Sequence, residues 1–374
     1  MRVVVNAAFL SGDHANEYLI FLSGTFKHIA HLHEEYHFIF FCEPHQADHF
    51  NFGNNAEVYL AKSGKKNTLT RKYWFDIKIP ALLRRYKADL FFSPDALCLV
   101  NTKLPQCILI NDPLFLHRPG LYTKKQLRFY NKYAGKALQK AKAILALSTN
   151  TKNKLTNNFS TAAGKIDTIY NGVCGLYKEQ TGNLKEEIKL KYTEGKEFFY
   201  YIESFYPNGN LINLLKAFSL FKKRQQSNFQ LIIYRRSSNA DPSFIAQLEK
   251  YKYKADVKII DNSIERDALI ILSSAYAFIY PVFTDDFCFS IIASMKMGIP
   301  IITSLDSAML ELTAGAALCV NPEDPQHIAE SMMRIYKDEK LRNELIEKSK
   351  TVAASYTTEK TAEQLWHLIS KCLD

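Results

Sequence analysis

Two adjacent acids, Asp285 and Asp286, stand between an apolar stretch with a strand-like pattern, residues 277–280, and an apolar stretch with helical spacing, residues 287–297. Carboxylates at the start of a helix either cap its free amides or accept hydrogen bonds from the hydroxyl groups of a ligand. The free amides themselves attract anions such as phosphate. This stretch is therefore the first candidate for a binding site.

A pair of arginines, Arg235 and Arg236, follows a second strand-like stretch, residues 229–234. A guanidinium group can hold a phosphate through two parallel hydrogen bonds, and parallel sheets bind ligands at the carboxyl ends of their strands. The pair is thus a candidate phosphate site. An arginine pair that is merely solvated at a strand end is an equally good interpretation.

Other catalytic patterns are not indicated. His31, His33 and His37 in HLHEEYH are spaced by two and four residues, which does not place all three on one face of a helix. We interpret them as surface histidines and expect no metal site. The sequence has no Gly-x-Ser-x-Gly segment and no Walker loop, which argues against serine-hydrolase chemistry and nucleotide hydrolysis.

The composition is that of a globular protein: 374 residues, 47% hydrophobic and 23% charged, a length that suggests two domains. Seven cysteines without CxxC spacing favour buried or incidental thiols in a reducing compartment. The sequence has no run of 18 apolar residues and no signal-like N-terminus, so a cytoplasmic protein is expected.

The positive charge lies in the first half of the chain. Residues 1–180 hold 24 Lys and Arg against 13 Asp and Glu, whereas residues 181–374 hold 24 against 25. The excess is densest in residues 62–87 and 118–154. A solvated basic face is one interpretation; a surface that meets a phosphorylated acceptor or the anionic inner face of a membrane is the other. No nucleic-acid-binding motif accompanies the charge, so no nucleic acid partner is expected.

The elements that must position these residues alternate between strand and helix. Strands are predicted at 2–6, 37–42, 88–93, 107–111, 143–148 and 165–170, and helices at 18–34 and 124–142. After a polar, Gly-containing lapse at 171–196, strands are predicted at 198–202, 229–234, 257–260, 277–280, 299–303 and 317–320. The helices of this half are predicted at 210–224, 242–252, 264–274, 287–297, 325–338, 341–355 and 358–372.

This alternation predicts an α/β protein with two doubly wound, Rossmann-like domains that face each other across a cleft. The N-terminal domain is expected to span residues 1–178, with 359–374 packing back on it. The C-terminal domain is expected to span residues 190–358.

Several motifs carry a resemblance to a known family. The block from YPVFTDDFCF to NPEDPQHIAE, with Pro281, Gly298, Pro300 and Glu311 in register, resembles the C-terminal half of GT-B glycosyltransferases of family 4. RVVVNAAFLSG, ADLFFSPD, ILINDPLF, AKAILALSTNTKNKL and KIDTIYNGV resemble segments of the N-terminal half.

The resemblance implies transfer of a sugar from a nucleotide-sugar, with retention of anomeric configuration, to a glycan or lipid-linked acceptor. It implies no metal and no cofactor besides the nucleotide-sugar substrate. By position, the implied catalytic residues are Asn111, Asp112 and Asp285. The implied donor-binding residues, with the arginine pair proposed above, are Gly12, Asn210, Arg235, Arg236, Asp286, Phe287, Cys288, Ser290 and Glu311.

The chain departs from the family's pattern at four places. Ser204 and Gly209 stand where the family has the Arg and Lys of Gly-Arg-x-x-x-x-Lys-Asn, and only Asn210 of that stretch is kept. Ala293 stands where a second acid binds the ribose, and Asn111 stands where the family has His. The glycine-rich loop of the N-terminal domain reads HANEY at 14–18.

Two hypotheses follow. In the first, the chain is a working hexosyltransferase whose donor is held by the arginine pair, the acids and the amides of the following helix. In the second, it is an inactive relative that binds a glycan or a partner protein.

Overall fold

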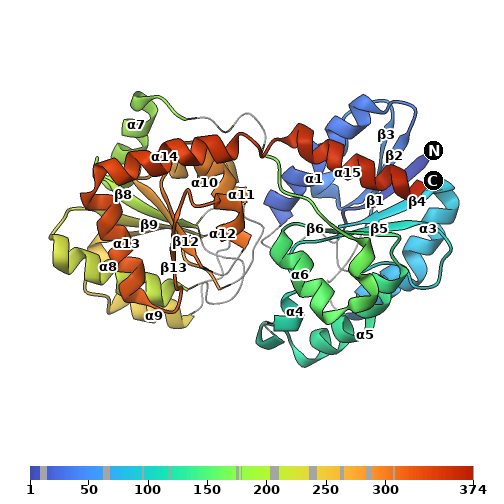
Figure 1. Cartoon of the computed structure of the whole chain (residues 1–374), viewed down its shortest axis with the longest axis horizontal. Helices are drawn as coiled ribbons and strands as arrows, with labels where there is room; N and C mark the ends of the chain where they lie inside the picture. Colours follow the sequence, from blue (N-terminus) through green and yellow to red (C-terminus); the bar gives the residue numbers. More distant parts are fainter. Residues whose placement is uncertain are drawn as a thin grey trace. The chain divides into compact units, whose positions relative to one another are not determined.

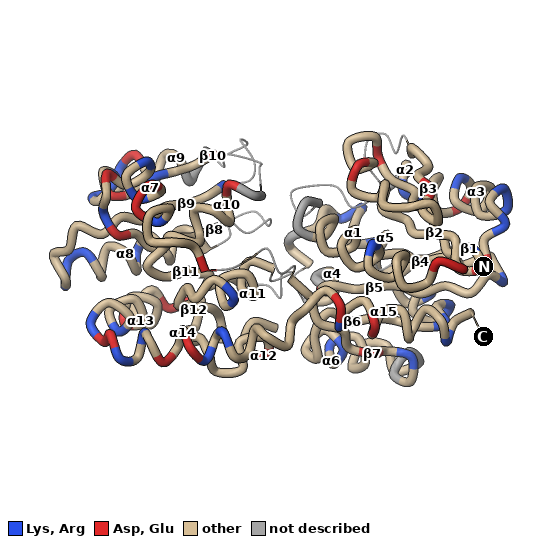
Figure 2. Tube along the Cα trace, turned by 90° about the horizontal axis from the view of Figure 1, so that it is seen from above, with Lys and Arg blue, Asp and Glu red and all other residues tan. Residues whose placement is uncertain are grey.

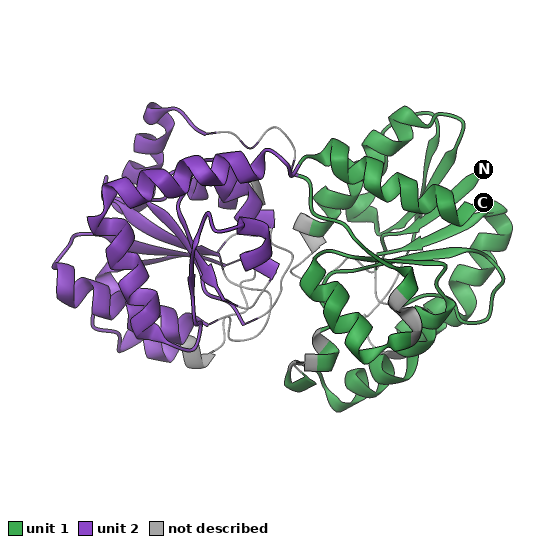
Figure 3. Cartoon of the chain, in the orientation of Figure 1, with its two compact units in different colours: residues 1–172, 357–374 green, residues 173–356 purple. Residues whose placement is uncertain are grey.

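The structure, a computed structural model, describes the chain apart from residues 9–14, 62–67, 95–96, 118, 174–176, 178, 203–209, 236–241, 262–264, 284–288, 306–307 and 374, and a few other side chains. The described residues form two compact units (Figure 3). Unit 1 comprises Met1–Gly172 and Thr357–Asp374, and unit 2 comprises Val173–Tyr356.

Unit 1 is built on a seven-stranded parallel sheet with the order β3-β2-β1-β4-β5-β6-β7 (Figure 1). Its strands are β1 (Arg2–Asn6), β2 (His37–Cys42), β3 (Ala56–Leu60), β4 (Leu90–Ser93), β5 (Gln106–Ile110), β6 (Ala143–Ala146) and β7 (Ile166–Thr168). Strands β4, β5 and β6 are buried at every residue, as expected for strands covered on both faces.

The longer helices of unit 1 connect or cover these strands. They are α1 (Ala15–Leu32), α2 (Thr68–Tyr73), the π-helical turn η2 (Trp74–Lys78), α3 (Ile79–Tyr86), α5 (Lys124–Lys140), α6 (Thr149–Asn158) and α15 (Thr358–Leu373). Short turns complete the unit: η1 (Pro44–Phe50), α4 (Leu114–His117), η3 (Pro119–Leu121) and η4 (Ser160–Lys165). Helix α15 packs against α1, β5 and β6, so the predicted return of the C-terminal helix to the N-terminal domain is confirmed.

Unit 2 repeats the architecture with a six-stranded parallel sheet in the order β10-β9-β8-β11-β12-β13. Its strands are β8 (Phe198–Ile202), β9 (Gln230–Arg235), β10 (Val257–Asp261), β11 (Ala277–Tyr280), β12 (Ile301–Ser304) and β13 (Leu318–Val320). Its helices are α7 (Gly182–Thr193), α8 (Leu211–Gln225), α9 (Pro242–Glu249), η5 (Lys254–Asp256), α10 (Glu265–Leu272), α11 (Phe289–Lys296), α12 (Ala308–Thr313), α13 (Pro325–Lys337) and α14 (Glu339–Ala353).

The predicted fold class is therefore confirmed, and most predicted elements lie within a few residues of their observed bounds. Strand β3 and helices α2, α3, α6, α7 and α12 were not predicted. Strand β3 (AEVYL) is a half-exposed edge strand, which lacks the continuous apolar run of an inner strand. Helix α7 lies in the polar lapse at 171–196, and only Ile188 and Thr193 of its residues are buried.

Both sheets reverse their strand order at one place. In unit 1 the chain builds outward from β1 to β3 and then returns to β4 on the other side of β1. In unit 2 the same reversal separates β8 from β11. Ligands of doubly wound sheets bind outside the carboxyl ends of the strands at such a reversal. In each unit we therefore expect functional residues beyond the carboxyl ends of the strands at this reversal.

Candidate functional site

The reversal in unit 2 is bridged by Asn210, which is 4% exposed and precedes α8. Its Nδ2 donates to the carbonyl oxygen of Pro281, directly after β11, at 2.5 Å, and to that of Pro322, shortly after β13, at 2.7 Å. Its Oδ1 accepts from Asn213 Nδ2 at 2.9 Å. One side chain therefore joins the segments that follow three strands of the sheet.

Asn210 also has a left-handed backbone, with φ of 49°. Asparagine adopts this conformation more readily than most residues, because its short polar side chain can bond locally. The residue is thus suited both to the turn that begins α8 and to the bonds across the edge. The family resemblance implied a donor-binding role for Asn210. In the structure, its side chain holds together the segments beyond the carboxyl ends of the strands.

Two hydroxyls extend the junction from β12 to the residues that follow β11. Thr303 Oγ1 donates to the carbonyl oxygen of Tyr280 at 3.1 Å, and Ser304 Oγ donates to that of Val282. All of these residues except Val282 belong to strands whose carboxyl ends meet here. The backbone that leads toward Asp285 is therefore fixed by side chains on both of its flanks.

Helix α11 follows this backbone and begins at Phe289. Every residue of the helix except Lys296 is buried. Ser290, a predicted donor-binding residue, is 6% exposed, and its carbonyl oxygen accepts from Ser294 Oγ at 2.7 Å. Ala293, which stands where the family pattern has the ribose-binding acid, is fully buried. The predicted residues Asp285, Asp286, Phe287 and Cys288 lie outside the described residues.

The arginine pair is divided by the structure. Arg235 ends β9, is 2% exposed, and lies opposite Asp261 of β10 in the sheet register. Its Nε is 3.0 Å from Asp261 Oδ1. This placement favours a structural ion pair at Arg235. Arg236 lies outside the described residues, and the phosphate role of the pair stays a prediction.

Glu311 lies in the first turn of α12, which follows β12, and it is half-buried. A carboxylate in the first turn of a helix is stabilised by the helix amides. Its position after β12 puts it beyond the same edge as Pro281 and Val282. Its donor-binding role stays a prediction.

In unit 1, Asn111 and Asp112 follow the carboxyl end of β5 as predicted from sequence. The carbonyl oxygen of Asn111 accepts from Thr151 Oγ1 of α6 at 2.7 Å. The Asp112 side chain is 2% exposed, and its Oδ1 lies 3.8 Å from Lys154 Nζ, also on α6. The start of α6 therefore holds this loop in place. Gly12, predicted for the same edge, lies outside the described residues.

Two buried polar residues at the reversal of unit 1 were not predicted. Asn6 ends β1 and Ser93 ends β4, and the register of these strands places the two side by side. Trp74 Nε1 donates to Asn6 Oδ1 at 3.4 Å. Asn6 Nδ2 and Ser93 Oγ have no hydrogen-bond partner among the described residues. The signal was present in the sequence, since VVVN and LFFS each close an apolar run with a polar residue.

The histidines of HLHEEYH lie away from these edges. His31 is exposed, His33 stacks on Trp366 with ring centroids 4.1 Å apart, and His37 Nε2 lies 3.3 Å from Glu57 Oε2. Within the described part of the chain, no three His, Cys, Asp or Glu side chains are grouped as metal ligands. No helix in that part is both long and apolar enough to cross a membrane.

Comparison with known proteins identifies both halves of the chain. Residues 183–352 match the family model "Glycosyl transferases group 1", and residues 25–174 match the model "Glycosyltransferase Family 4". Between them the two models account for most of the chain, and each lies largely within one of the two units.

Two curated relatives and one solved structure are similar over most of their length. The chain is 22% identical to O-antigen chain mannosyltransferase B of Escherichia coli, covering 70% of this chain and 68% of that protein. It is 24% identical to O-antigen chain mannosyltransferase RfbU of Salmonella typhimurium, covering 76% and 77%. The structure of Anabaena Alr3699/HepE in complex with UDP-glucose superposes with a TM-score of 0.78 at 12% identity, covering 99% of this chain and 100% of that one.

Proposed function

Since this chain belongs to the group 1, family 4 glycosyltransferases of GT-B fold, we propose that it transfers a hexose from a nucleoside-diphosphate sugar to a glycan acceptor, with retention of configuration and without a metal ion. The donor binds at the carboxyl edge of the unit 2 sheet, and the acceptor binds at that of unit 1. The relatives named as O-antigen chain mannosyltransferases support a polysaccharide acceptor and make mannose the first sugar to test.

The observation that carries the donor assignment is the junction at Asn210. It fixes the ends of the segments after β8, β11 and β13 at the place where the strand order reverses. A diphosphate needs preorganised amides and cations around it, because charge grows on its oxygen as the sugar leaves. The amides that begin α11, together with Arg236, meet that need in this proposal.

In the proposed reaction, the bond between the anomeric carbon and the diphosphate oxygen breaks, and an acceptor hydroxyl forms the new bond on the same face of the sugar. The acceptor proton leaves with the diphosphate product. Asp285 accepts hydrogen bonds from donor sugar hydroxyls, and Asn111 and Asp112 face the acceptor. Glu311 holds the donor from the opposite side of the junction.

The hypothesis of an inactive relative is the less favoured of the two. Family and relatives are those of sugar transferases. The replacements Ser204, Gly209 and Ala293 remove groups on which other family members rely, so donor affinity here depends on Arg236 and the helix amides. A lone chain that releases no nucleotide from any sugar donor, yet retains a bound glycan, would restore the inactive-relative hypothesis.

Thermal shift with UDP, GDP and ADP tests the donor site directly. At a nucleotide concentration of 100 Kd, a bound nucleotide stabilises the folded chain by about 2.7 kcal/mol. We expect one of the three to raise Tm, Arg236→Ala to remove the shift, and the surface control Arg224→Ala to keep it. No stabilisation by any nucleotide would contradict the proposal. Nucleotide release from UDP-glucose and GDP-mannose then identifies the donor.

We also propose that unit 1 works at the anionic inner face of a membrane, where a lipid-linked acceptor would be held. Unit 1 contains 25 Lys and Arg against 15 Asp and Glu, whereas unit 2 contains 23 of each. Helix α5 has no acid, and Figure 2 shows basic residues at the end of α3, which carries Arg84 and Arg85 in its last turn. The exposed cations of α5 are Lys124, Lys125, Arg128, Lys132, Lys136 and Lys140.

An apolar element lies beside this charge. Tyr73 and Ile77 are 54% and 58% exposed, one turn apart across the junction of α2 and η2. Arg71 Nη1 donates to Tyr130 OH at 2.6 Å, which ties α2 to α5. Exposed apolar side chains next to a basic helix have the pattern of a membrane-surface contact, in which cations attract the headgroups and apolar side chains enter the interface.

Vesicle co-sedimentation tests the membrane contact. Binding to vesicles that contain phosphatidylglycerol is expected to fall steeply between 0.05 and about 0.5 M salt, because the Debye length shortens. Ile77→Glu is expected to weaken binding, and Leu190→Glu, at a 67% exposed position of unit 2, is the matched control. Equal binding of the two variants, or salt-independent binding, would exclude this surface.

A further inference from the structure

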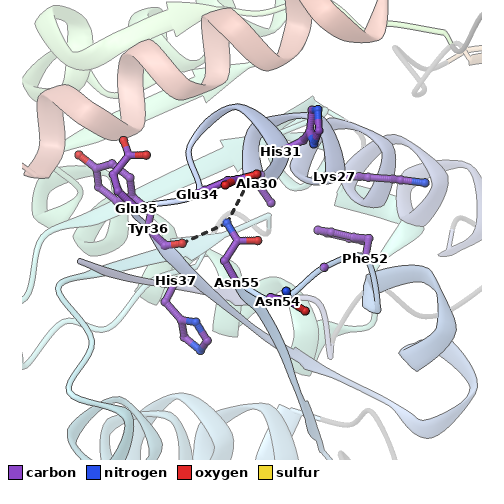
Figure 4. Close-up of a pocket in the computed structure, with 11 residues that line it drawn as sticks. Lys27, Ala30, His31, Glu34, Glu35, Tyr36, His37, Phe52, Asn54 and Asn55 are labelled. Atoms are coloured by element: carbon purple, nitrogen blue, oxygen red, sulfur yellow. Dashed lines mark hydrogen bonds between the residues drawn. The ribbon is translucent and has the colours of Figure 1, made fainter.

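A separate cavity lies at the opposite edge of the unit 1 sheet, where the strands begin. Its volume is about 640 Å³, within the range of small-molecule sites. It is bounded by the C-terminal half of α1, the turn at Glu34–His37 that leads into β2, and the loop at Phe52–Asn55 that leads into β3 (Figure 4). Asn6, Ser93 and the Asn111 loop lie at the opposite, carboxyl ends of β1, β4 and β5 in the same parallel sheet.

The floor of the cavity is fixed by Asn55. Its Nδ2 lies within hydrogen-bond distance of the carbonyl oxygens of Ala30, at 2.9 Å, and Tyr36, at 3.2 Å (Figure 4). Gly53, which has φ of 145°, gives the loop a conformation that other residues rarely adopt. The shape of the cavity is therefore set by the Asn55 side chain and the loop conformation at Gly53 before any ligand arrives.

The polar groups around this floor include both donors and acceptors. Lys27, Glu34 and Asn54 are exposed, and none of them has a hydrogen-bond or ion-pair partner among the residues that the structure describes. The Oδ1 atom of Asn55 likewise accepts no hydrogen bond from a described residue. Phe52 adds apolar surface and is held by an edge contact with Phe40, with ring centroids 5.4 Å apart.

This combination matches the chemistry of a neutral saccharide. Sugar hydroxyls donate and accept at once, so they need ammonium or amide donors beside carboxylate or carbonyl acceptors. The apolar C–H surface of a sugar ring packs on an aromatic side chain. A phosphate or nucleotide fits less well, because Glu34 and Glu35 would repel it. We infer that this cavity is an accessory saccharide site, which holds part of the glycan acceptor away from the reaction centre.

The inference rests on the proposed function, because an enzyme that extends a polysaccharide binds acceptors longer than one sugar. It is tested on the full-length protein without donor. The probe is mannotriose, with trigalacturonate as an anionic comparison. Binding is measured by saturation-transfer NMR and by calorimetry, for the wild type and two double variants.

The test variant is Glu34→Ala with Asn54→Ala. The matched control is Glu187→Ala with Asn131→Ala, which changes the same residue types at exposed positions on α7 and α5. We expect mannotriose to bind the wild type and the control equally. The test variant should bind about tenfold more weakly, as the loss of two hydrogen bonds implies.

Absent binding to the wild type, equal weakening in both variants, or preference for trigalacturonate would overturn the saccharide site. The nucleotide thermal shift, measured on the same variants, separates the two proposals. A nucleotide shift without mannotriose binding removes only the accessory site. Mannotriose binding that is lost in the test variant, without any nucleotide shift, removes only the proposed donor chemistry.

Discussion

At the scale of single residues, the edge of unit 2 depends on a few buried polar side chains rather than on charge. Asn210 satisfies two carbonyl oxygens from distant segments of the chain, and Thr303 and Ser304 satisfy two more. A buried polar group that loses its partner costs far more than one intact hydrogen bond contributes. These residues therefore hold together the described segments that follow β11 and β13.

Asn210→Ala is expected to destabilise the protein by about 2–3 kcal/mol, because two carbonyl oxygens lose their donor and alanine disfavours the left-handed backbone. Asn210→Gly keeps the backbone conformation and loses only the hydrogen bonds, so its cost should be smaller. Urea unfolding of both variants measures the difference. An alanine variant as stable as the wild type would show that the junction is not required.

The candidate site was predictable in part, and the limits lie in particular residues. The family pattern identified Asn111, which follows β5, and Asn210, which precedes α8. Arg235 was also placed at an edge, but the sequence could not show that Asp261 lies opposite it in the register. Which strands pair is decided by the tertiary fold. For the same reason the sequence did not show that Asn6 and Ser93 lie side by side.

At the scale of elements, the inner strands and most of the longer helices were predicted, because each buries a continuous apolar face. Strand β3 and helix α7 bury little, so their pattern is weak, and both were missed. Contacts between elements were not readable from the sequence. An example is Tyr251, whose hydroxyl donates to the carbonyl oxygen of Leu215 at 2.8 Å and accepts from Ser219 Oγ at 2.9 Å, which joins the turn after α9 to α8.

This Tyr251 contact predicts a loss of stability at alkaline pH. Burial raises the pKa of Tyr251 to about 12 from its ordinary 10.0. The unfolded chain releases the phenol proton near pH 10 while the folded chain retains it, so the contribution is complete below pH 10 and is lost as pH rises toward 12. Tyr251→Phe should be less stable at pH 8 but should lose less stability between pH 10 and 12. Chemical unfolding across this range measures both slopes, and parallel slopes would contradict the assignment.

At the scale of the whole molecule, the two units differ in charge and share no sheet. All of the net charge of +10 lies in unit 1, and unit 2 is neutral. Each unit has its own parallel sheet and its own buried core. Such units commonly fold independently.

Residues 173–356, produced alone, are therefore expected to unfold cooperatively and to pass through a cation exchanger at pH 7. The full-length chain, with its basic unit 1, should be retained. Circular dichroism during urea unfolding and the elution salt concentration are the measurements. A non-cooperative transition would show that unit 2 needs unit 1 to fold.

The chain leaves unit 1 after Gly172 and returns to it at Thr357, and these two residues are neighbours in space. A Cβ atom added to Gly172 would lie 2.2 Å from the carbonyl oxygen of Thr357, and Val173 N donates to the carbonyl oxygen of Tyr356 at 3.3 Å. Unit 2 is thus an insert whose two ends are neighbours, and both termini of the chain lie in unit 1 (Figure 1). A chimaera between this chain and another group 1 enzyme needs only one graft site, at which all of unit 2 can be exchanged while unit 1 keeps its own backbone.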